Sequence, residues 1–216
     1  MIETGVHFGD IHSFHDLGLI LAPYTPTPAE PKTTYQEIPG GNGALDLSEV
    51  HGEIKYSDRT FSFTFTVNAA DPMPFDEKVS QVSNALNGKR CKITLDRDPA
   101  YFWEGRCTVD AYKQDGRLKQ VSVSAKVKPY KYKQEKTVKT VDLTTESQEI
   151  TLYNGRLSVV PVFECAADTA IIFNGTSYAI STGTHKILDI RLTEGENTLT
   201  VSGSGTLTIT YQEGEL

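Results

Sequence analysis

The fold is decided most clearly by the run Arg59-Thr60-Phe61-Ser62-Phe63-Thr64-Phe65-Thr66-Val67. Apolar and polar side chains alternate along it, so the phenylalanines and the valine share one face of an extended strand. We expect that face to be buried and the other to meet water, as in antiparallel sheets. The run 120–127 alternates in the same way, and Asp115-Gly116 before it predicts a hairpin with a strand at 107–112.

One helix is predicted over residues 74–87, where apolar side chains recur at helical spacing. These side chains are Phe75, Val79, Val82 and Leu86. Asp76 and Glu77 fall in the first turn, where negative charge complements the helix dipole. Gly88 follows the last turn and can take the left-handed conformation that ends a helix. We expect the apolar stripe to pack on a sheet.

After about residue 140 the pattern changes to short strands separated by turns, with no helical period. Asn174-Gly175 is a strong two-residue hairpin turn. Strands are predicted at 148–153, 158–165, 169–173, 177–180, 186–192, 198–202 and 206–211. Short strands at this spacing predict a small β-sandwich. We place the domain boundary within 130–142, which separates a domain of residues 1–135 from one of residues 140–216.

Charge is distributed unevenly along the 216 residues, which are 38% hydrophobic and 23% charged, as in an ordinary globular protein. Residues 1–139 carry equal numbers of basic and acidic side chains, whereas residues 140–216 carry three basic and ten acidic ones. An acidic segment excludes nucleic-acid binding by the second domain. The lysines within 126–139 are interpreted as an exposed strand edge rather than a phosphate-binding patch.

Membrane insertion and a disulfide framework are not expected. No apolar run approaches the roughly 20 residues that cross a bilayer, and the first residues lack the basic and apolar regions of a secretory signal. The cysteines Cys91, Cys107 and Cys165 lie far apart in the sequence and outside any Cys-x-x-Cys motif. An odd count excludes complete pairing, so we expect free, buried thiols.

Two clusters of side chains offer weak evidence for chemistry. His12-x-x-His15-Asp16 has residue types that bind metals. A metal site also needs ligands that converge and are held in place by further hydrogen bonds, and a short polar segment gives no indication of either. Asp96, Asp98 and Glu104 lie near the aromatic residues 101–103, and paired carboxylates beside an aromatic can cleave a sugar. Turn formation explains Asp-Arg-Asp-Pro more simply. We therefore assign no catalytic, cofactor-binding or metal-binding residue and expect that the chain is not an enzyme.

Residues 22–43 are unusually rich in proline. The prolines are Pro23, Pro26, Pro28, Pro31 and Pro39. This density excludes a helix or a central strand and leaves an extended arm or edge segment. The glycines in Gly40-Gly41-Asn42-Gly43 are not followed by the Lys of a phosphate-binding loop, so they predict a tight turn with positive φ. A long irregular segment of this kind is usually functional or disordered.

A series of short motifs runs along nearly the whole chain. It begins with His7-Phe8-Gly9-Asp10-Ile11-His12-Ser13 and includes Ile38-Pro39-Gly40-Gly41-Asn42-Gly43-Ala44-Leu45-Asp46-Leu47. Further motifs lie at 16–21, 31–32, 56–63, 86–89, 101–106, 129–132, 192–197 and 211–216. No single motif is specific, but in this order they resemble the distal tail (Dit) proteins of siphophages and related prophages.

The resemblance implies a mainly β fold, in which an N-terminal β-barrel-like domain with one helix precedes a small galectin-like β-sandwich. It implies a virion structural protein whose N-terminal domain closes a homo-hexameric ring. The ring would be the baseplate hub that joins the tail tube to the host-adsorption apparatus. Other partners would be a tail-associated tip protein and a receptor-binding protein, and genome DNA would pass through the ring without sequence-specific binding. The location would be the virion tail tip, after synthesis in the bacterial host cytoplasm.

Ring closure requires surface that is buried between identical subunits. The proline-rich segment is the best candidate for an arm on a neighbouring copy, with Pro26, Pro28, Pro31 and Tyr35 as expected contacts. The neutral charge of residues 1–139 suits close packing of six copies, and the acidic domain is expected at the periphery. The alternative function is a carbohydrate-binding adhesin module for a host cell-wall sugar. Residues 140–216 contain no Trp and few aromatics, which favours a docking module.

Overall fold

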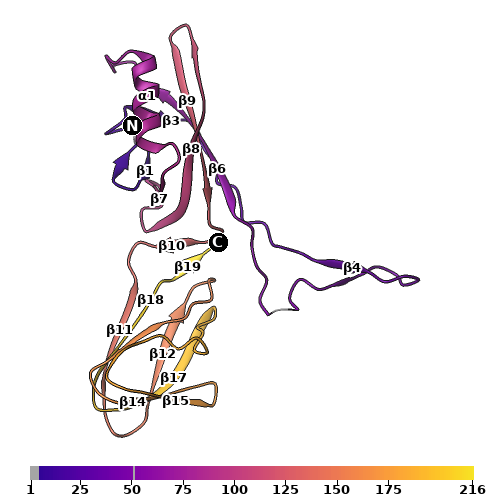
Figure 1. Ribbon diagram of the computed structural model, residues 1–216, viewed down its shortest axis with the longest axis vertical. Coiled ribbons are helices and arrows are strands. Elements are labelled where there is room, and N and C mark those ends of the chain that lie inside the picture. The colour runs from indigo at the N-terminus through magenta and orange to yellow at the C-terminus, as the bar shows by residue number, and fades with distance from the viewer. Residues whose placement is uncertain (1–4, 51) are drawn as a thin grey trace. The chain divides into compact units, whose positions relative to one another are not determined.

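The computed structural model describes residues 5–50 and 52–216. It divides into two compact units, Met1–Lys131 and Tyr132–Leu216, each with its own hydrophobic core (Figure 1). Strands dominate both units and the described residues hold a single helix, so the predicted mainly β class is confirmed. The limits 1–135 and 140–216, and the assignment of a ring-forming and a peripheral domain, stay predictions.

The first unit is built on a curled antiparallel sheet with the strand order β2-β1-β7-β8-β9-β6-β3. Its elements are β1 (Val6–Phe8), β2 (Ile11–His12), β3 (Leu19–Leu21), β4 (Tyr35–Glu37), β5 (Ala44–Asp46), β6 (Arg59–Val67), α1 (Phe75–Leu86), β7 (Arg90–Leu95), β8 (Tyr101–Asp115) and β9 (Leu118–Val127). β4 and β5 pair only with each other and stand outside this sheet.

β6 has the alternating burial that its sequence predicts. Phe61, Phe63, Phe65 and Val67 are buried, whereas the Thr and Ser residues between them are exposed or half-buried. β9 pairs with β6 on one side and with β8 on the other, and Gly116 turns the β8–β9 hairpin at φ +58°. The predicted strand and hairpin are confirmed, and their inward faces form the core of the unit.

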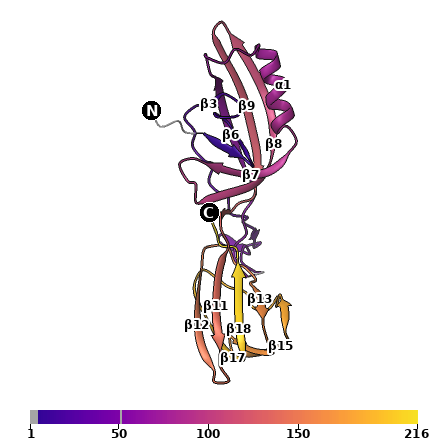
Figure 2. The ribbon, with the colours of Figure 1, turned by 90° about the vertical axis from the view of Figure 1, so that its left-hand side faces the viewer.

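α1 confirms the predicted helix and lies against β8, as Figure 2 shows. The expected apolar stripe is buried, and Gly88 takes a left-handed φ of +73° after the last turn. Lys78 is also buried, which the stripe does not predict. Its Nζ lies 2.6 Å from Asp71 Oδ2 and donates to the Leu17 carbonyl at 3.1 Å. The charge is therefore paired and hydrogen-bonded, as a buried lysine requires.

The second unit is a β-sandwich of two four-stranded sheets, with the orders β11-β18-β13-β16 and β12-β17-β14-β15. Strand bounds from the end of β9 onward are β10 (Lys131–Lys133), β11 (Thr137–Leu143), β12 (Gln148–Asn154), β13 (Val162–Cys165), β14 (Thr169–Phe173), β15 (Thr176–Ile180), β16 (Gly183–His185), β17 (Gly195–Gly203), β18 (Gly205–Tyr211) and β19 (Gly214–Glu215). Asn174 and Gly175 have φ of +47° and +77°, which confirms the predicted hairpin turn.

Two predictions for this unit are wrong. Residues 186–192 form no strand, and the short β16 lies just before them. Ile190 and Leu192 are nevertheless fully buried, so alternate side chains of this irregular segment still point into the core. The strand expected at 158–165 begins only at Val162, immediately after a proline that cannot donate to a ladder. Residues 130–142, which include the predicted domain boundary, hold β10 and most of β11.

Within residues 5–50 and 52–216, no helix combines the length and the apolar character that crossing a membrane demands.

Candidate assembly surface

The proline-rich segment leaves the sheet of the first unit as an arm, which comprises residues 22–57 apart from residue 51. Near its base the two sides are held together by backbone hydrogen bonds, among them Lys32 N to Lys55 O at 2.7 Å. Farther along, β4 and β5 pair antiparallel, and Figure 1 shows them as a narrow two-stranded ribbon. Gly40 and Gly43 have φ of +78° and +79°, which confirms the turn predicted from their sequence.

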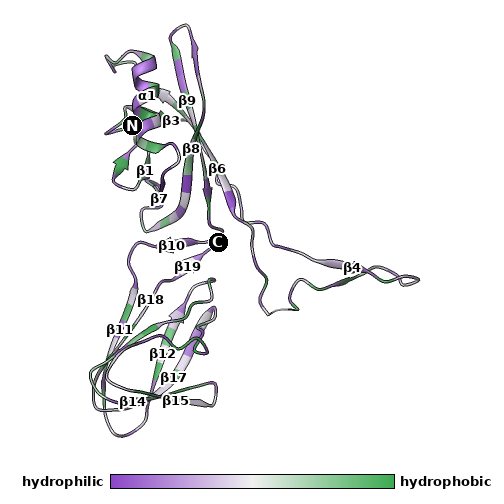
Figure 3. Cartoon of the chain, viewed as in Figure 1, coloured by the Kyte–Doolittle hydropathy of each residue, from purple (hydrophilic) through white to green (hydrophobic). Residues whose placement is uncertain are grey.

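The outer part of the arm has no buried side chain. Every residue from 31 to 46 is exposed. Large apolar side chains are more than half exposed at Tyr35 (61%), Ile38 (52%), Leu45 (51%) and Val50 (63%). Figure 3 shows short apolar stretches that interrupt the otherwise polar ribbon. A lone two-stranded hairpin is marginally stable in water, so this arm is suited to packing against another molecule.

The root of the arm is fixed in the core by Tyr24. Its ring lies 4.6 Å from the ring of Phe63, and its carbonyl accepts a hydrogen bond from Arg97 Nη1 at 3.2 Å. Burial raises the pKa of Tyr24 above its ordinary value of 10.0. Thr27 Oγ1 donates to the Thr60 carbonyl at 3.1 Å. The chain therefore leaves the core from a defined point, whereas residues 31–46 of the arm are all exposed.

The predicted contact residues all lie on this arm. Pro26 is half-buried near the root, Pro28 and Pro31 are exposed, and Tyr35 opens β4. Their contact with a neighbouring subunit stays a prediction. Sequence reasoning missed the exposed apolar side chains beyond Tyr35, because β4 and β5 are only three residues long and show no buried alternation. The available clue was a set of large aliphatic residues around a glycine-rich turn.

The arm and the segment that follows it carry opposite charge. Residues 22–57 contain five carboxylates and two lysines, whereas residues 58–131 contain nine carboxylates and thirteen basic side chains. The overall neutrality of residues 1–139 therefore conceals an acidic arm and a basic segment at 58–131. Complementary patches favour association and oppose the meeting of like surfaces.

Two of the three carboxylates considered for sugar hydrolysis are paired with lysine or arginine side chains. Asp98 binds Lys131 at 2.9 Å, and Glu104 binds Lys128 at 2.9 Å and Arg90 at 3.0 Å. The hydrogen bond from Lys128, assisted by that from Arg90, lowers the pKa of Glu104. A general acid in such a reaction needs a raised pKa instead. These contacts are those of surface ion pairs, and the expectation that the chain is not an enzyme stays a prediction.

The histidines near the N-terminus form a different cluster from the expected one. His7, His12 and Asp96, rather than His12, His15 and Asp16, bring their ligand atoms within 4.8 Å of one another. His12 Nδ1 accepts hydrogen bonds from the amides of Phe14 and His15, so its Nε2 carries the proton and donates to Asp96 at 3.1 Å. A protonated nitrogen is not a metal ligand. The arrangement fits a hydrogen-bonded anchor for the first strands.

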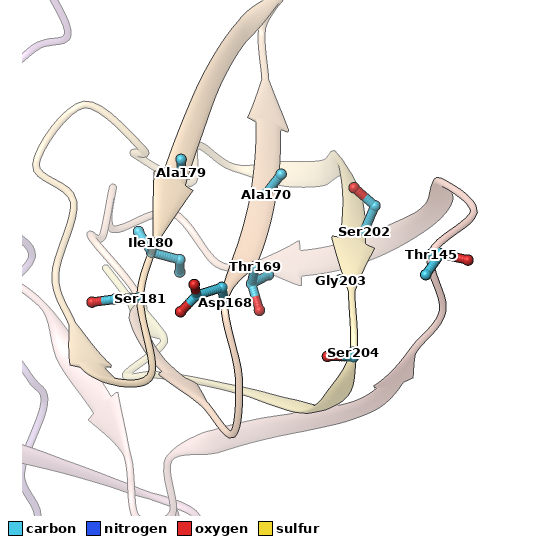
Figure 4. Close-up of a pocket in the computed structure, with 10 residues that line it drawn as sticks. All are labelled: Thr145, Asp168, Thr169, Ala170, Ala179, Ile180, Ser181, Ser202, Gly203 and Ser204. Carbon is cyan, nitrogen blue, oxygen red and sulfur yellow. The ribbon is translucent and has the colours of Figure 1, made fainter.

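The second unit has a shallow hollow of about 560 Å³ beside β14, β15 and β17 (Figure 4). Its lining comprises Thr145, Asp168, Thr169, Ala170, Ala179, Ile180, Ser181, Ser202, Gly203 and Ser204. These described residues include one carboxylate and no aromatic side chain. Small-molecule sites usually combine apolar or aromatic walls with a few polar groups. The hollow therefore gives little support to sugar recognition.

No protein-family model and no curated protein matches the chain. Among solved structures, it is similar to the Dit protein (gp 19.1) of phage SPP1, which is described as a paradigm of the hub adsorption apparatus in phages that infect Gram-positive bacteria. The two chains share 15% sequence identity with a TM-score of 0.71, over 97% of this chain and 98% of that chain. At this identity the likeness is one of fold, and at that level it confirms the resemblance to distal tail proteins.

Proposed function

We propose that this protein is a distal tail protein of a siphophage or prophage. Six copies form a ring that joins the tail tube to the host-adsorption apparatus. The observation that carries the proposal is the likeness of fold to the SPP1 hub protein, which covers 97% of this chain and therefore includes both units and most of the arm. A likeness over the entire length is stronger support than a shared sandwich, because sandwiches recur in many unrelated proteins.

The arm supports ring formation through its charge and exposure. Its exposed apolar residues would be buried on a neighbouring copy, and its acidic side chains would meet the basic residues of 58–131. Each copy then offers one arm and receives another, which is a heterologous contact. Heterologous contacts close into a ring when the rotation between copies allows it. Pro26, Pro28, Pro31 and Tyr35 would lie within this contact.

The remaining partners follow from a hub position at the virion tail tip, after assembly in the host cytoplasm. The tail tube would stack on one face of the ring, and the tip protein and receptor-binding protein would attach to the other. The acidic second unit would lie at the periphery as a docking module. DNA would pass through the ring without sequence-specific contacts.

The first test is the mass of the particle at several protein concentrations. Light scattering should give six times the mass of the chain at the highest concentration, with smaller species on dilution. Negative-stain images of the same sample should show rings. A chain that stays monomeric up to its solubility limit, with the arm present, would refute ring closure by the protein alone.

The second test removes the apolar contacts of the arm. Ile38→Ser combined with Leu45→Ser should raise the concentration needed for the hexamer by about tenfold or more, since each buried aliphatic side chain contributes about 1.5–3 kcal/mol. Deletion of residues 25–29 should weaken the hexamer further. The matched control is Leu188→Ser in the second unit, where the side chain is 72% exposed but lies outside the arm. Equal loss of oligomer in the control would contradict the role of the arm.

The adhesin alternative is tested with the full chain on an array of cell-wall glycans. Selective binding that disappears with Asp168→Ala in the hollow would favour an adhesin over a docking module. Absence of binding at high protein concentration is the result expected for a structural hub.

A further inference from the structure

Two of the three cysteines meet in the core of the first unit although 15 residues separate them in the sequence. Cys91 lies on β7 and Cys107 on β8, and their Sγ atoms are 3.6 Å apart. Both are free thiols. Cys107 is fully buried, whereas Cys91 is half-buried.

The register of the two strands explains this contact. Gly105 is directly opposite Cys91, so Cys107 is its diagonal neighbour on the same inward face. Because Gly105 has no side chain, Cys91 can lean across the strand toward Cys107. A Cβ at Gly105 would lie 2.5 Å from the Lys126 carbonyl, so the close packing of β8 on β9 also requires glycine here.

We propose that Cys91 and Cys107 are a redox-sensitive pair that forms a disulfide between β7 and β8 when the protein meets a low-molecular-weight disulfide. The sulfur atoms are already in van der Waals contact, and a bond requires an approach of about 1.5 Å to reach roughly 2.05 Å. The bond would therefore require rotation of the two side chains and a small shift of β7 toward β8.

The two thiols have different roles in the exchange. Cys91 is the more accessible thiol, and a hydrogen bond from Cys107 lowers its pKa, so it attacks the external disulfide. One external thiolate leaves, and Cys91 is joined to the other half in a mixed disulfide. Cys107 then loses its proton and attacks the Cys91 sulfur, which expels the second external thiolate. In total one external disulfide gains two electrons and two protons, and the protein loses two hydrogens.

The crosslink restrains the edge of the sheet that carries β7, β1 and β2. A loop of this length that is closed by a disulfide restricts the unfolded chain, and we expect the melting temperature to rise by about 5–10 °C. If the protein is the proposed tail hub, the bond would form when the virion leaves the reducing cytoplasm. This timing rests on the proposed function, whereas the crosslink itself does not.

The experiment exposes the full chain to oxidised glutathione and compares it with a sample kept in dithiothreitol. We expect the intact mass to fall by about 2 Da, corresponding to one disulfide with no adduct. Thiols counted after denaturation should fall from three to one, and peptide mapping should join the segments that contain Cys91 and Cys107. The melting temperature should rise in the oxidised sample only.

Single substitutions separate this result from unspecific oxidation. Cys165→Ser removes the cysteine of the second unit and should keep both the crosslink and the melting shift. Cys91→Ser should abolish both, and reduced Cys91→Ser should unfold cooperatively near the reduced parent. Three remaining thiols after oxidation, a stable glutathione adduct, or a bond that includes Cys165 would each overturn the proposal. Light scattering on the same samples reports the hexamer separately, so failure of the ring and failure of the crosslink are distinguishable.

Discussion

The first unit contains two hairpins whose apolar residues go to different places. β8 and β9 pair from Gly105 and Val127 to Asp115 and Leu118, and the inward side chains near their base belong to the core. β4 and β5 pair over three residues each, and all of them are exposed. The β8–β9 hairpin is thus stabilised by packing within its own chain, whereas the β4–β5 hairpin has the composition and exposure of an element that packs against another molecule.

The largest expected effect on stability is that of a substitution in the core of the first unit. Phe63→Ala should lower the free energy of unfolding by about 4 kcal/mol, because it leaves a cavity at a side chain that is 1% exposed. The substitution also removes the phenyl ring that packs against Tyr24 at the root of the arm. Urea unfolding at a concentration where the chain is monomeric measures this loss.

The matched substitution on the arm is Ile38→Ala. It should change the unfolding free energy of the monomer by less than about 0.5 kcal/mol, as expected for an exposed position. If the two substitutions destabilise the monomer equally, the arm has packing within its own chain and the comparison fails.

The next largest effect concerns the buried ion pair beneath α1. Asp71→Asn should cost about 3 kcal/mol, because it leaves the Lys78 charge buried without its counter-ion. The double variant Asp71→Asn with Lys78→Met should recover most of this loss, since a methionine needs no counter-charge. Thermal unfolding of both variants and of Lys78→Met alone completes the cycle. A double variant as unstable as Asp71→Asn alone would contradict the assignment.

This pair also predicts a dependence on pH. The hydrogen bond from Lys78 is the main cause that lowers the pKa of Asp71 below its ordinary value of 3.8. A lowered folded-state pKa stabilises the protein above the unfolded value and loses this contribution as the pH falls through the folded value. The stability of the parent should therefore fall from about pH 4 downward more steeply than that of Asp71→Asn, as acid titrations of unfolding would show.

Sequence periodicity predicted the elements whose residues are buried within their own unit. The alternation of Phe61, Phe63 and Phe65 predicted β6, and the helical spacing of 75–86 predicted α1. It failed where the buried side chain is not apolar. Lys78 lies on the buried face of α1, and its ion pair with Asp71, which is in a loop, is a contact that no helical pattern encodes.

The candidate site was predictable only in outline. Proline density indicated an extended arm, but the pairing of β4 with β5 depends on a turn between two strands too short for periodicity to reveal. The Cys91–Cys107 contact depends on the register of β7 against β8, which spacing in the sequence does not specify. Contacts between segments far apart in the sequence could thus be found only in the structure, whereas the sequence alone predicts which face of an individual strand is buried.

The smallest expected effect comes from the same substitution in both hairpin turns. Gly43 and Gly116 have φ of +79° and +58°, and a Cβ added at either position would meet no other atom within 4 Å. Alanine therefore costs about 1–2 kcal/mol of backbone strain at each, with no steric clash. Gly116→Ala should lower the unfolding free energy by about 1 kcal/mol, because its hairpin continues into the core.

Gly43→Ala should instead leave the unfolding of the monomer unchanged and raise the concentration needed for the hexamer by about fivefold, since about 1 kcal/mol of strain then opposes docking of the arm. Urea unfolding and light scattering on the two variants separate these readouts. The decisive result is which of the two quantities changes, the unfolding free energy of the monomer or the concentration needed for the hexamer. If Gly43→Ala destabilised the monomer and left the hexamer unchanged, the arm would be part of the fold and not of the assembly.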